Sequence, residues 1–169
     1  MFDLEGKTAL VTGATGGIGS AIAKSLNSHG VSVVLSGRNE DRLKELADDI
    51  GDRVSYFSAS LDAPNSEADL FKNAKKALGR VDILVNNAGV TRDALAIRMS
   101  DDDWSRVIEV NLASSFRLAR AALKGMMRNR WGRVINITSV VGITGNPGQT
   151  NYVASKAGLS GMSKALAAE

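Results

Sequence analysis

A tyrosine and a lysine stand four residues apart near the end of the printed sequence, at Tyr152 and Lys156. In a helix this spacing puts both side chains on one face, where a phenol and an ammonium can meet. A free tyrosine holds its proton too tightly for acid–base work near neutral pH, and a neighbouring ammonium favours the phenolate. The spacing therefore predicts a tuned proton donor, although such a pair by itself is more often an incidental surface feature.

Two other polar segments are expected close to this pair. Ser139 follows the predicted strand Arg133–Thr138, and in open α/β sheets the ligand crevice lies beyond the carboxyl ends of the strands. A serine hydroxyl at that place can donate a hydrogen bond to a substrate carbonyl oxygen. Asn86, Ala88 and Gly89 end the preceding predicted strand in the same crevice, so they can line a cofactor, with a plain turn as the alternative.

A glycine-rich segment, residues 12–19, lies between the first predicted strand and the first predicted helix. Gly13 permits a tight turn, Gly17 lets the backbone approach a pyrophosphate, and Gly19 lets the helix pack close to the sheet. The N–H groups at the helix start can then bind phosphate. The segment lacks the Lys-Ser/Thr ending of a nucleoside triphosphate loop, which argues against an ATPase. The candidate cofactor residues in this segment are Gly13, Thr15, Gly17, Ile18 and Gly19.

The second predicted strand ends at Arg38, about 20 residues after the glycines, where a dinucleotide site contacts the adenine ribose. An acidic residue there would accept from the 2′-hydroxyl of NAD, whereas an arginine can pair with the 2′-phosphate of NADP. The sequence therefore favours NADP(H) over NAD. The alternative for Arg38 is an ordinary exposed arginine near a helix start.

The elements that must position these residues alternate along the chain as strand and helix, five times over. The predicted strands read as continuous apolar runs, which is typical of strands buried on both faces. This order predicts an α/β fold with a doubly wound, Rossmann-like parallel sheet and helices on both faces, in one domain spanning residues 1–169. The predicted strands are Thr8–Thr12, Val31–Ser36, Val54–Ala59, Asp82–Asn86 and Arg133–Thr138. The predicted helices are Ile18–His29, Glu40–Ile50, Ser66–Leu78, Asp102–Asn129 and Tyr152–Ala168.

Individual residues refine this pattern at three points. Asn39 and Ser100 each precede a run of acidic residues and are predicted helix N-caps. Asn111 is a polar residue within the apolar pattern of the longest predicted helix. Taken singly, Asn111 is better explained as a buried asparagine with satisfied hydrogen bonds than as a catalytic group.

Composition narrows the possible functions. The sequence has no cysteine and a single histidine, His29, so thiol chemistry and a histidine metal cluster are not predicted. The net charge is +3, but the basic residues are scattered, so nucleic acid is not predicted as a partner. The sequence shows neither a secretory signal nor an apolar run long enough for a membrane span, and a cytoplasmic protein is expected.

Taken in order, these motifs resemble those of the short-chain dehydrogenase/reductase family over the whole chain. The resemblance implies that Ser139 polarises a substrate carbonyl and that Tyr152 protonates its oxygen as hydride reaches the carbon. Lys156 would also hold the nicotinamide ribose, and Asn111 would hold a water in a proton relay to Lys156. Asp62 would contact the adenine. The matching residues are Thr12-Gly13-x3-Gly17-Ile18-Gly19, Asp62, Asn86-Asn87-Ala88-Gly89, Asn111, Ser139 and Tyr152-x3-Lys156.

Segments 89–93, 126–133 and 145–152 further resemble bacterial reductases of 3-oxoacyl groups carried by acyl carrier protein. That resemblance implies fatty acid synthesis, NADPH and a homotetramer whose interface contains the helices of Asn111 and Tyr152. It also implies that Arg130 helps to dock the carrier protein. A cationic patch near the mouth of the site can steer an acidic partner, and a solvated surface charge is the alternative for Arg130.

Three alternatives remain open at this point. The substrate could be a CoA thioester such as acetoacetyl-CoA, or a free ketone, instead of a carrier-protein thioester. A non-catalytic dinucleotide-binding or assembly protein is the alternative from another class. Family members continue past the position of Glu169, so we expect the family's C-terminal strands and substrate lid to be missing from this chain.

Overall fold

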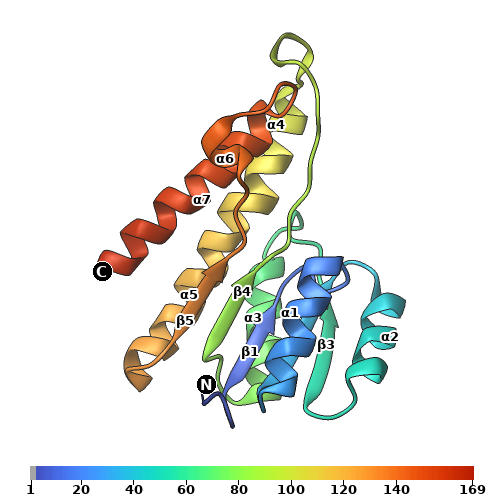
Figure 1. Cartoon of the computed structure of the whole chain (residues 1–169), viewed down its shortest axis with the longest axis vertical. Coiled ribbons are helices and arrows are strands. Elements are labelled where there is room, and N and C mark those ends of the chain that lie inside the picture. The colour runs from blue at the N-terminus through green and yellow to red at the C-terminus, as the bar shows by residue number, and fades with distance from the viewer. Residues whose placement is uncertain (1–2) are drawn as a thin grey trace.

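The computed structural model describes residues 3–169, and its centre is one sheet of five parallel strands in the order β3-β2-β1-β4-β5 (Figure 1). The chain begins in the middle with β1 and moves outward through β2 and β3. It then crosses to the other side of β1 for β4 and β5, so the direction of winding reverses between β1 and β4. This order confirms the predicted doubly wound sheet. The strands are β1 (Thr8–Val11), β2 (Ser32–Gly37), β3 (Val54–Ser58), β4 (Ile83–Asn86) and β5 (Arg133–Asn136).

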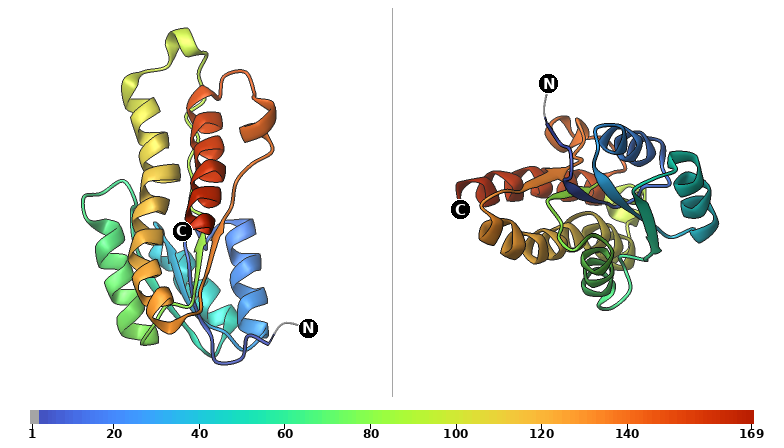
Figure 2. Two further views of the ribbon diagram at one scale, coloured as in Figure 1. Left: turned by 90° about the vertical axis from the view of Figure 1, so that its left-hand side faces the viewer. Right: turned by 90° about the horizontal axis from the view of Figure 1, so that it is seen from below.

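Helices cover both faces of the sheet, as predicted (Figure 2). Successive strand residues point to opposite faces, so Leu10 and Leu84 are buried on one face and Val11 and Val85 on the other. Both sets belong to apolar cores, which explains why the strands read as continuous apolar runs. Helices α1 (Gly17–Ser28) and α2 (Glu40–Ile50) pack on the face of Val11, and α3 (Ser66–Leu78) and α5 (Ser114–Asn129) on the face of Leu10.

The long helix predicted over Asp102–Asn129 is interrupted in the structure. It consists of α4 (Asp101–Ile108), a π-helical turn η2 (Glu109–Ala113) and then α5. At this turn the hydroxyls of Ser114 and Ser115 donate to the carbonyl oxygens of Val110 and Asn111, at 2.6 and 3.0 Å. Side chains that bond to helix carbonyls commonly bend a helix, and a single π-turn often marks a functional position.

Several boundaries differ slightly from the prediction. The last helix, α7 (Thr150–Ala168), begins two residues earlier than expected, and the sequence does not predict the short elements η1 (Ala96–Arg98) and α6 (Val141–Thr144). Both predicted N-caps are confirmed, because Asn39 accepts from the N–H of Arg42 and Ser100 from that of Asp103.

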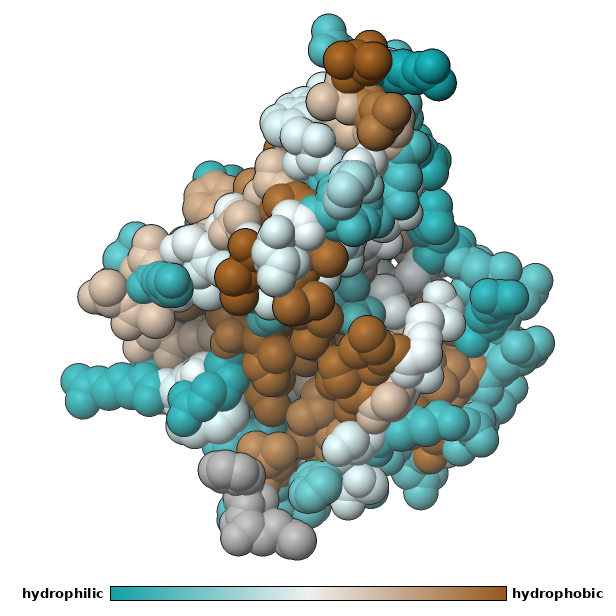
Figure 3. Space-filling view, turned by 45° about the horizontal axis from the view of Figure 1, so that its top comes forward, coloured by the Kyte–Doolittle hydropathy of each residue, from teal (hydrophilic) through white to brown (hydrophobic). Residues whose placement is uncertain are grey.

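The face of the sheet that carries α1 is less covered at β5, an edge strand. Ile135 on this strand is 41% exposed, although its neighbour in register, Val85 on β4, is fully buried. Hydrophobic side chains gather on this side of the molecule (Figure 3). Among residues 3–169, none of the helices combines the length and the apolar character needed to cross a membrane.

Candidate active site

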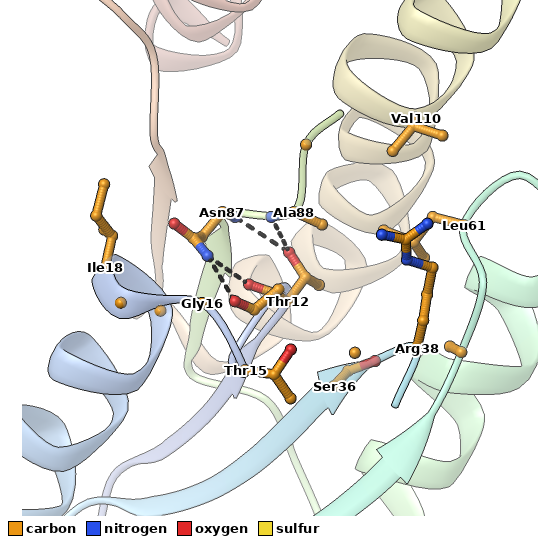
Figure 4. Close-up of a pocket in the computed structure, with 16 residues that line it drawn as sticks. Thr12, Thr15, Gly16, Ile18, Ser36, Arg38, Leu61, Asn87, Ala88 and Val110 are labelled. Atoms are coloured by element: carbon orange, nitrogen blue, oxygen red, sulfur yellow. Dashed lines mark hydrogen bonds between the residues drawn. The ribbon is translucent and has the colours of Figure 1, made fainter. Parts of the chain in front are cut away.

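A cleft of about 380 Å³ opens at the carboxyl ends of β1, β2 and β4, where the winding of the sheet reverses (Figure 4). Its volume lies within the range of small-ligand pockets, and its place is the one that open α/β sheets use for ligands. Within residues 3–169, no aspartate or glutamate lines it. Of the predicted cofactor-binding residues, the cleft is lined by Gly13, Thr15, Gly17, Ile18, Gly19, Arg38, Ala88 and Gly89.

The glycines of the loop fall into two kinds. A Cβ added to Gly13 would lie 2.8 Å from the Cα of Ala88, and one added to Gly19 would lie 2.3 Å from the carbonyl oxygen of Gly13. Gly13 also has a φ of +62°, a conformation that favours glycine. A Cβ on Gly17 would meet nothing within 4 Å. Gly13 and Gly19 therefore allow close packing, whereas Gly17 leaves open space at the start of α1.

Two side chains for which the sequence predicts no role hold the loop against the end of β4 (Figure 4). The Thr12 hydroxyl oxygen accepts from the N–H groups of Asn87 and Ala88, both at 3.1 Å. The amide nitrogen of Asn87 donates to the carbonyl oxygens of Thr12 and Gly13, at 3.1 and 3.0 Å. Each of them lies in a motif whose neighbouring residues are predicted to bind the cofactor, and this is the signal that the sequence offers for them.

Arg38 and Asp62 lie close together but differ in surroundings. Arg38 is exposed, lines the cleft beside Leu61, and forms no ion pair with an acid of residues 3–169 (Figure 4). Asp62 is absent from the lining of the cleft and instead pairs with Arg106. A hydrogen bond from Ser60, with the charges of Arg106 and Arg38 as further causes, holds the pKa of the Asp62 carboxyl below its usual range.

Asn86 is also absent from the lining of the cleft. Its side chain is buried and donates to the side-chain oxygen of Asn136 at 2.8 Å and to the carbonyl oxygen of Ser115 at 3.3 Å. Asn136 in turn donates to the hydroxyl of Ser163 at 2.8 Å. Asn86 thus begins a polar chain that joins β4, β5, α5 and α7 behind the cleft.

Tyr152 and Lys156 lie on one face of α7, with Lys156 almost completely buried. The Lys156 Nζ donates to the carbonyl oxygen of Ile137 at 2.7 Å and lies 5.6 Å from the centre of the Tyr152 ring. A Cβ built on the cleft residue Gly89 would lie 3.7 Å from Nζ. Burial lowers the pKa of Lys156 from its ordinary value. The structure therefore brings the phenol, the ammonium and one wall of the cleft together.

Ser139 belongs to the segment that follows β5 and packs against α7. The carbonyl oxygen of Ser139 accepts from the N–H of Gly142 at 3.0 Å. A Cβ on Gly142 would lie 3.2 Å from the backbone carbon of Lys156, so this turn is in contact with α7 at the lysine. Because Ile137 accepts the bond from Lys156, the segment is held on both sides of Ser139.

Asn111 is fully buried at the π-turn, and its amide is satisfied within the protein. Its oxygen accepts from the N–H of Val90 at 2.8 Å, and its nitrogen donates to the Val90 carbonyl at 3.0 Å and to the Ser155 hydroxyl at 3.1 Å. These bonds join the segment after Gly89 to α7. The water relay assigned to Asn111 stays a prediction.

Arg130 lies far from these residues within one chain. It is the exposed C-cap of α5, with a φ of 51°, and it precedes the amino end of β5. The cleft lies at the carboxyl ends of the parallel strands, so Arg130 and the cleft are at opposite ends of the strands. Arg130 is therefore not beside the cleft of its own chain, and its role in docking a carrier protein stays a prediction.

Comparisons with known proteins agree with one another. A family model described as short chain dehydrogenase matches residues 7–169. Nodulation protein G of a Rhizobium species is 57% identical over 169 residues, which are all of this chain and 69% of that protein. The 3-oxoacyl-[acyl-carrier-protein] reductase FabG of Rickettsia bellii is 52% identical over 169 residues, 68% of its length. A solved short chain dehydrogenase/reductase family protein, 37% identical, matches with a TM-score of 0.93 over 99% of this chain and 69% of that one.

Proposed function

The chain belongs to the short-chain dehydrogenase family of oxidoreductases, and we propose that it reduces 3-oxoacyl groups on acyl carrier protein to 3-hydroxyacyl groups in fatty acid synthesis, with NADPH as reductant. The observation that carries the proposed chemistry is the buried Lys156 ammonium, which lies 5.6 Å from the centre of the Tyr152 ring and close to Gly89. It supports a proton-transfer pair next to a cleft that suits a dinucleotide. The similarity to a reductase named for this substrate supports the choice of acyl group.

The cleft fits a nicotinamide dinucleotide, which when bound supplies the hydride. The start of α1 has no side-chain cap, and Gly17 leaves space in front of its first N–H groups, which suits a pyrophosphate. Arg38 offers its guanidinium to a 2′-phosphate. An acidic residue to bind a 2′-hydroxyl is missing from the cleft's described lining, and this supports NADP over NAD.

We assign proton transfer to the residues on α7 and after β5. Tyr152 donates its hydroxyl proton to the substrate carbonyl oxygen, and Ser139 donates a hydrogen bond to the same atom. Burial lowers the pKa of Lys156, so its ammonium releases a proton more readily and can help to return one to Tyr152. Asn111 lies next to this pair at the π-turn, and we keep for it the role of holding a water that feeds the relay.

The test of this assignment is Tyr152→Phe in the purified protein. We expect turnover to fall about 10³-fold, since positioned acid–base groups contribute 10²–10⁴-fold, while affinity for NADPH stays within about twofold. Tyr56→Phe is the matched control, because Tyr56 is the other tyrosine of the chain and lies on β3, away from the cleft lining. Wild-type turnover by Tyr152→Phe would refute the proton-donor role. NADPH binding without any turnover by the wild-type protein would favour the non-catalytic alternative.

The acyl carrier protein is proposed as the donor of the substrate, with a basic surface at Arg130 as its contact. Arg130 and the cleft of one chain lie at opposite ends of the strands. A carrier bound at Arg130 would therefore serve the cleft of a neighbouring copy in the predicted homotetramer. We expect turnover of a carrier-protein thioester to exceed that of the CoA thioester and to fall in Arg130→Glu. Equal rates with no loss in that variant would favour a CoA thioester or a free ketone as substrate.

A further inference from the structure

The first turn of α7, which carries Tyr152, is held by a buried amide. Gln149 is the N-cap and makes no side-chain capping bond. Asn151, two residues after Gln149, is completely buried. Its side-chain oxygen accepts from the N–H of Tyr152 at 2.7 Å, and its nitrogen donates to the carbonyl oxygens of Arg92 and Asp103 at 3.0 and 3.3 Å. The amide thus uses both of its donor hydrogens and an acceptor site.

These bonds tie the backbone of Tyr152 to two distant parts of the chain. Arg92 lies in the segment that follows the cleft residue Gly89, and Asp103 lies in the first turn of α4. The same junction is closed by the Ala94 N–H, which donates to the Gly148 carbonyl at 2.8 Å. Because the partners of Asn151 are backbone carbonyls, their positions depend on the path of the chain and not on side-chain rotamers.

A second amide holds the same segment on the other side of Tyr152. Asn111 bonds both backbone groups of Val90 and the hydroxyl of Ser155, and that hydroxyl donates to the carbonyl oxygen of Tyr152 at 2.7 Å. The segment from Val90 to Arg92 is therefore fastened to α7 both before and after the phenol. The sequence predicts a role for Asn111, whereas Asn151 lies in the segment 145–152 without a role of its own.

We propose that Asn151 is a positioning residue for Tyr152, fixing the first turn of α7 so that the phenol stays beside the Lys156 ammonium. This inference rests on the proton-donor role given to Tyr152 in the proposed function. Displacement of a reacting group by about 1 Å can cost about 10²-fold in rate. Loss of the Asn151 bonds leaves the carbonyls of Arg92 and Asp103 without this donor and frees the turn to shift.

The experiment is Asn151→Ala in the purified protein, with Asn146→Ala as the matched control. Asn146 is an exposed asparagine five residues earlier, whose amide donates only to the side chain of Gln149. We expect kcat to fall about 10- to 100-fold in Asn151→Ala, with KM and the Kd for NADPH within about threefold, and the control to stay within about twofold of wild type. Wild-type kcat in a folded Asn151→Ala protein would overturn the proposal.

A double variant separates positioning from simple loss of folded protein. If Asn151 acts through Tyr152, then Asn151→Ala should reduce the small remaining turnover of Tyr152→Phe by less than about twofold. An equal factor in both backgrounds would overturn the proposal. Should Asn151→Ala fail to fold, Asn151→Ser provides the test, since serine keeps a polar group but is too short to reach both carbonyls. Its kcat should fall in the same way, and a folded, fully active serine variant would overturn the proposal.

These results also separate this inference from the proposed function. If Tyr152→Phe keeps wild-type turnover, the proton-donor role is wrong, and so is the positioning role proposed for Asn151. If Tyr152→Phe is inactive and Asn151→Ala is fully active, the proposed function stands and only the role of Asn151 is wrong.

Discussion

The two regions that meet at the cleft are built in different ways. The glycine loop between β1 and α1 depends on close approach, because a Cβ on Gly19 would collide with the carbonyl of Gly13, only six residues earlier. The region around Tyr152 depends instead on buried polar bonds between distant segments, such as those from Lys156 to Ile137 and from Asn151 to Arg92. Added atoms should therefore disrupt the packing of the first region, whereas lost polar groups should reduce turnover in the second.

The sharpest test of this difference is Lys156→Met, which removes a buried charge from the polar region and keeps its volume. Turnover should fall about 10³-fold, because the partner of Tyr152 is lost. Stability should rise by about 1 kcal/mol near neutral pH, since a buried charge is costly and functional groups often reduce stability. Urea unfolding of both proteins measures this, with Lys164→Met on the exposed side of α7 as control.

The pH dependence of unfolding tests whether the burial of Lys156 reduces the stability of the protein. Burial lowers the pKa of Lys156 in the folded state below the value of 10.5 that it has when unfolded. Between those two values the unfolded chain binds more protons, so the free energy of unfolding contributed by Lys156 rises with pH through that window. Lys156→Met should lose this rise. A Met variant that is less stable than wild type at every pH would show that the lysine's hydrogen bond outweighs its burial.

Gly19→Ala tests the glycine loop by adding one carbon. The new Cβ would lie 2.3 Å from the carbonyl oxygen of Gly13, so the loop must shift away from the start of α1. We expect a loss of about 2 kcal/mol in stability, typical of overpacking, and about 100-fold weaker NADPH binding, measured by cofactor fluorescence titration, as the amides of the helix start are misplaced. Gly161→Ala in α7 is the control, because its Cβ meets nothing within 4 Å. Unchanged affinity would mean that the loop adapts and that close approach is not what shapes it.

The sequence predicts the glycine loop well because its residues act through their own backbone. Gly13 and Gly19 are needed for reasons of local geometry, and the five strands follow from continuous apolar runs that any parallel sheet must bury. Boundaries such as the start of α7 differ by only one or two residues.

The second region was harder to predict because side-chain direction depends on tertiary contacts. Asn86 stands in a recognised motif, yet its amide points to Asn136 and away from the cleft lining. Arg130 lies in a segment that resembles carrier-protein reductases, but its position in the sequence does not say at which end of the strands it lies. Asn151 lies in the recognised segment 145–152, but the sequence gives it no role, and only the fold brings Arg92 and Asp103 to it.

Arg38→Asp probes a third kind of contact, an exposed charge at the rim of the glycine-loop region. Charge-assisted hydrogen bonds contribute about 1.5–3 kcal/mol, so preference for NADPH over NADH should fall about 10- to 100-fold. The ratio of kcat/KM for the two cofactors measures it. Arg42→Asp, an exposed arginine on α2 outside the cleft lining, should leave the ratio unchanged. An unchanged ratio in Arg38→Asp would mean that the rim does not select the cofactor.

The smallest effect is expected from Ser163→Ala, which shortens the polar chain behind the catalytic region. The Ser163 hydroxyl donates to the Leu159 carbonyl and accepts from Asn136, whereas Ser28 in α1 makes a comparable bond to the Ser25 carbonyl without a partner from another element's side chain. Ser163→Ala should cost about 1 kcal/mol, the usual value of one hydrogen bond, and Ser28→Ala much less.

The hydrogen bond from Asn136 to Ser163 joins β5 to α7. Its loss should therefore loosen α7 relative to the segment that carries Ser139. Turnover is then expected to fall a few-fold. NADPH affinity should stay at the wild-type value, since no residue of the glycine loop takes part in these hydrogen bonds. Chemical denaturation, steady-state turnover and cofactor titration on the two serine variants measure all three quantities. Equal losses of turnover and affinity in Ser163→Ala would show that the two regions respond as one unit, and the contrast between them would not hold.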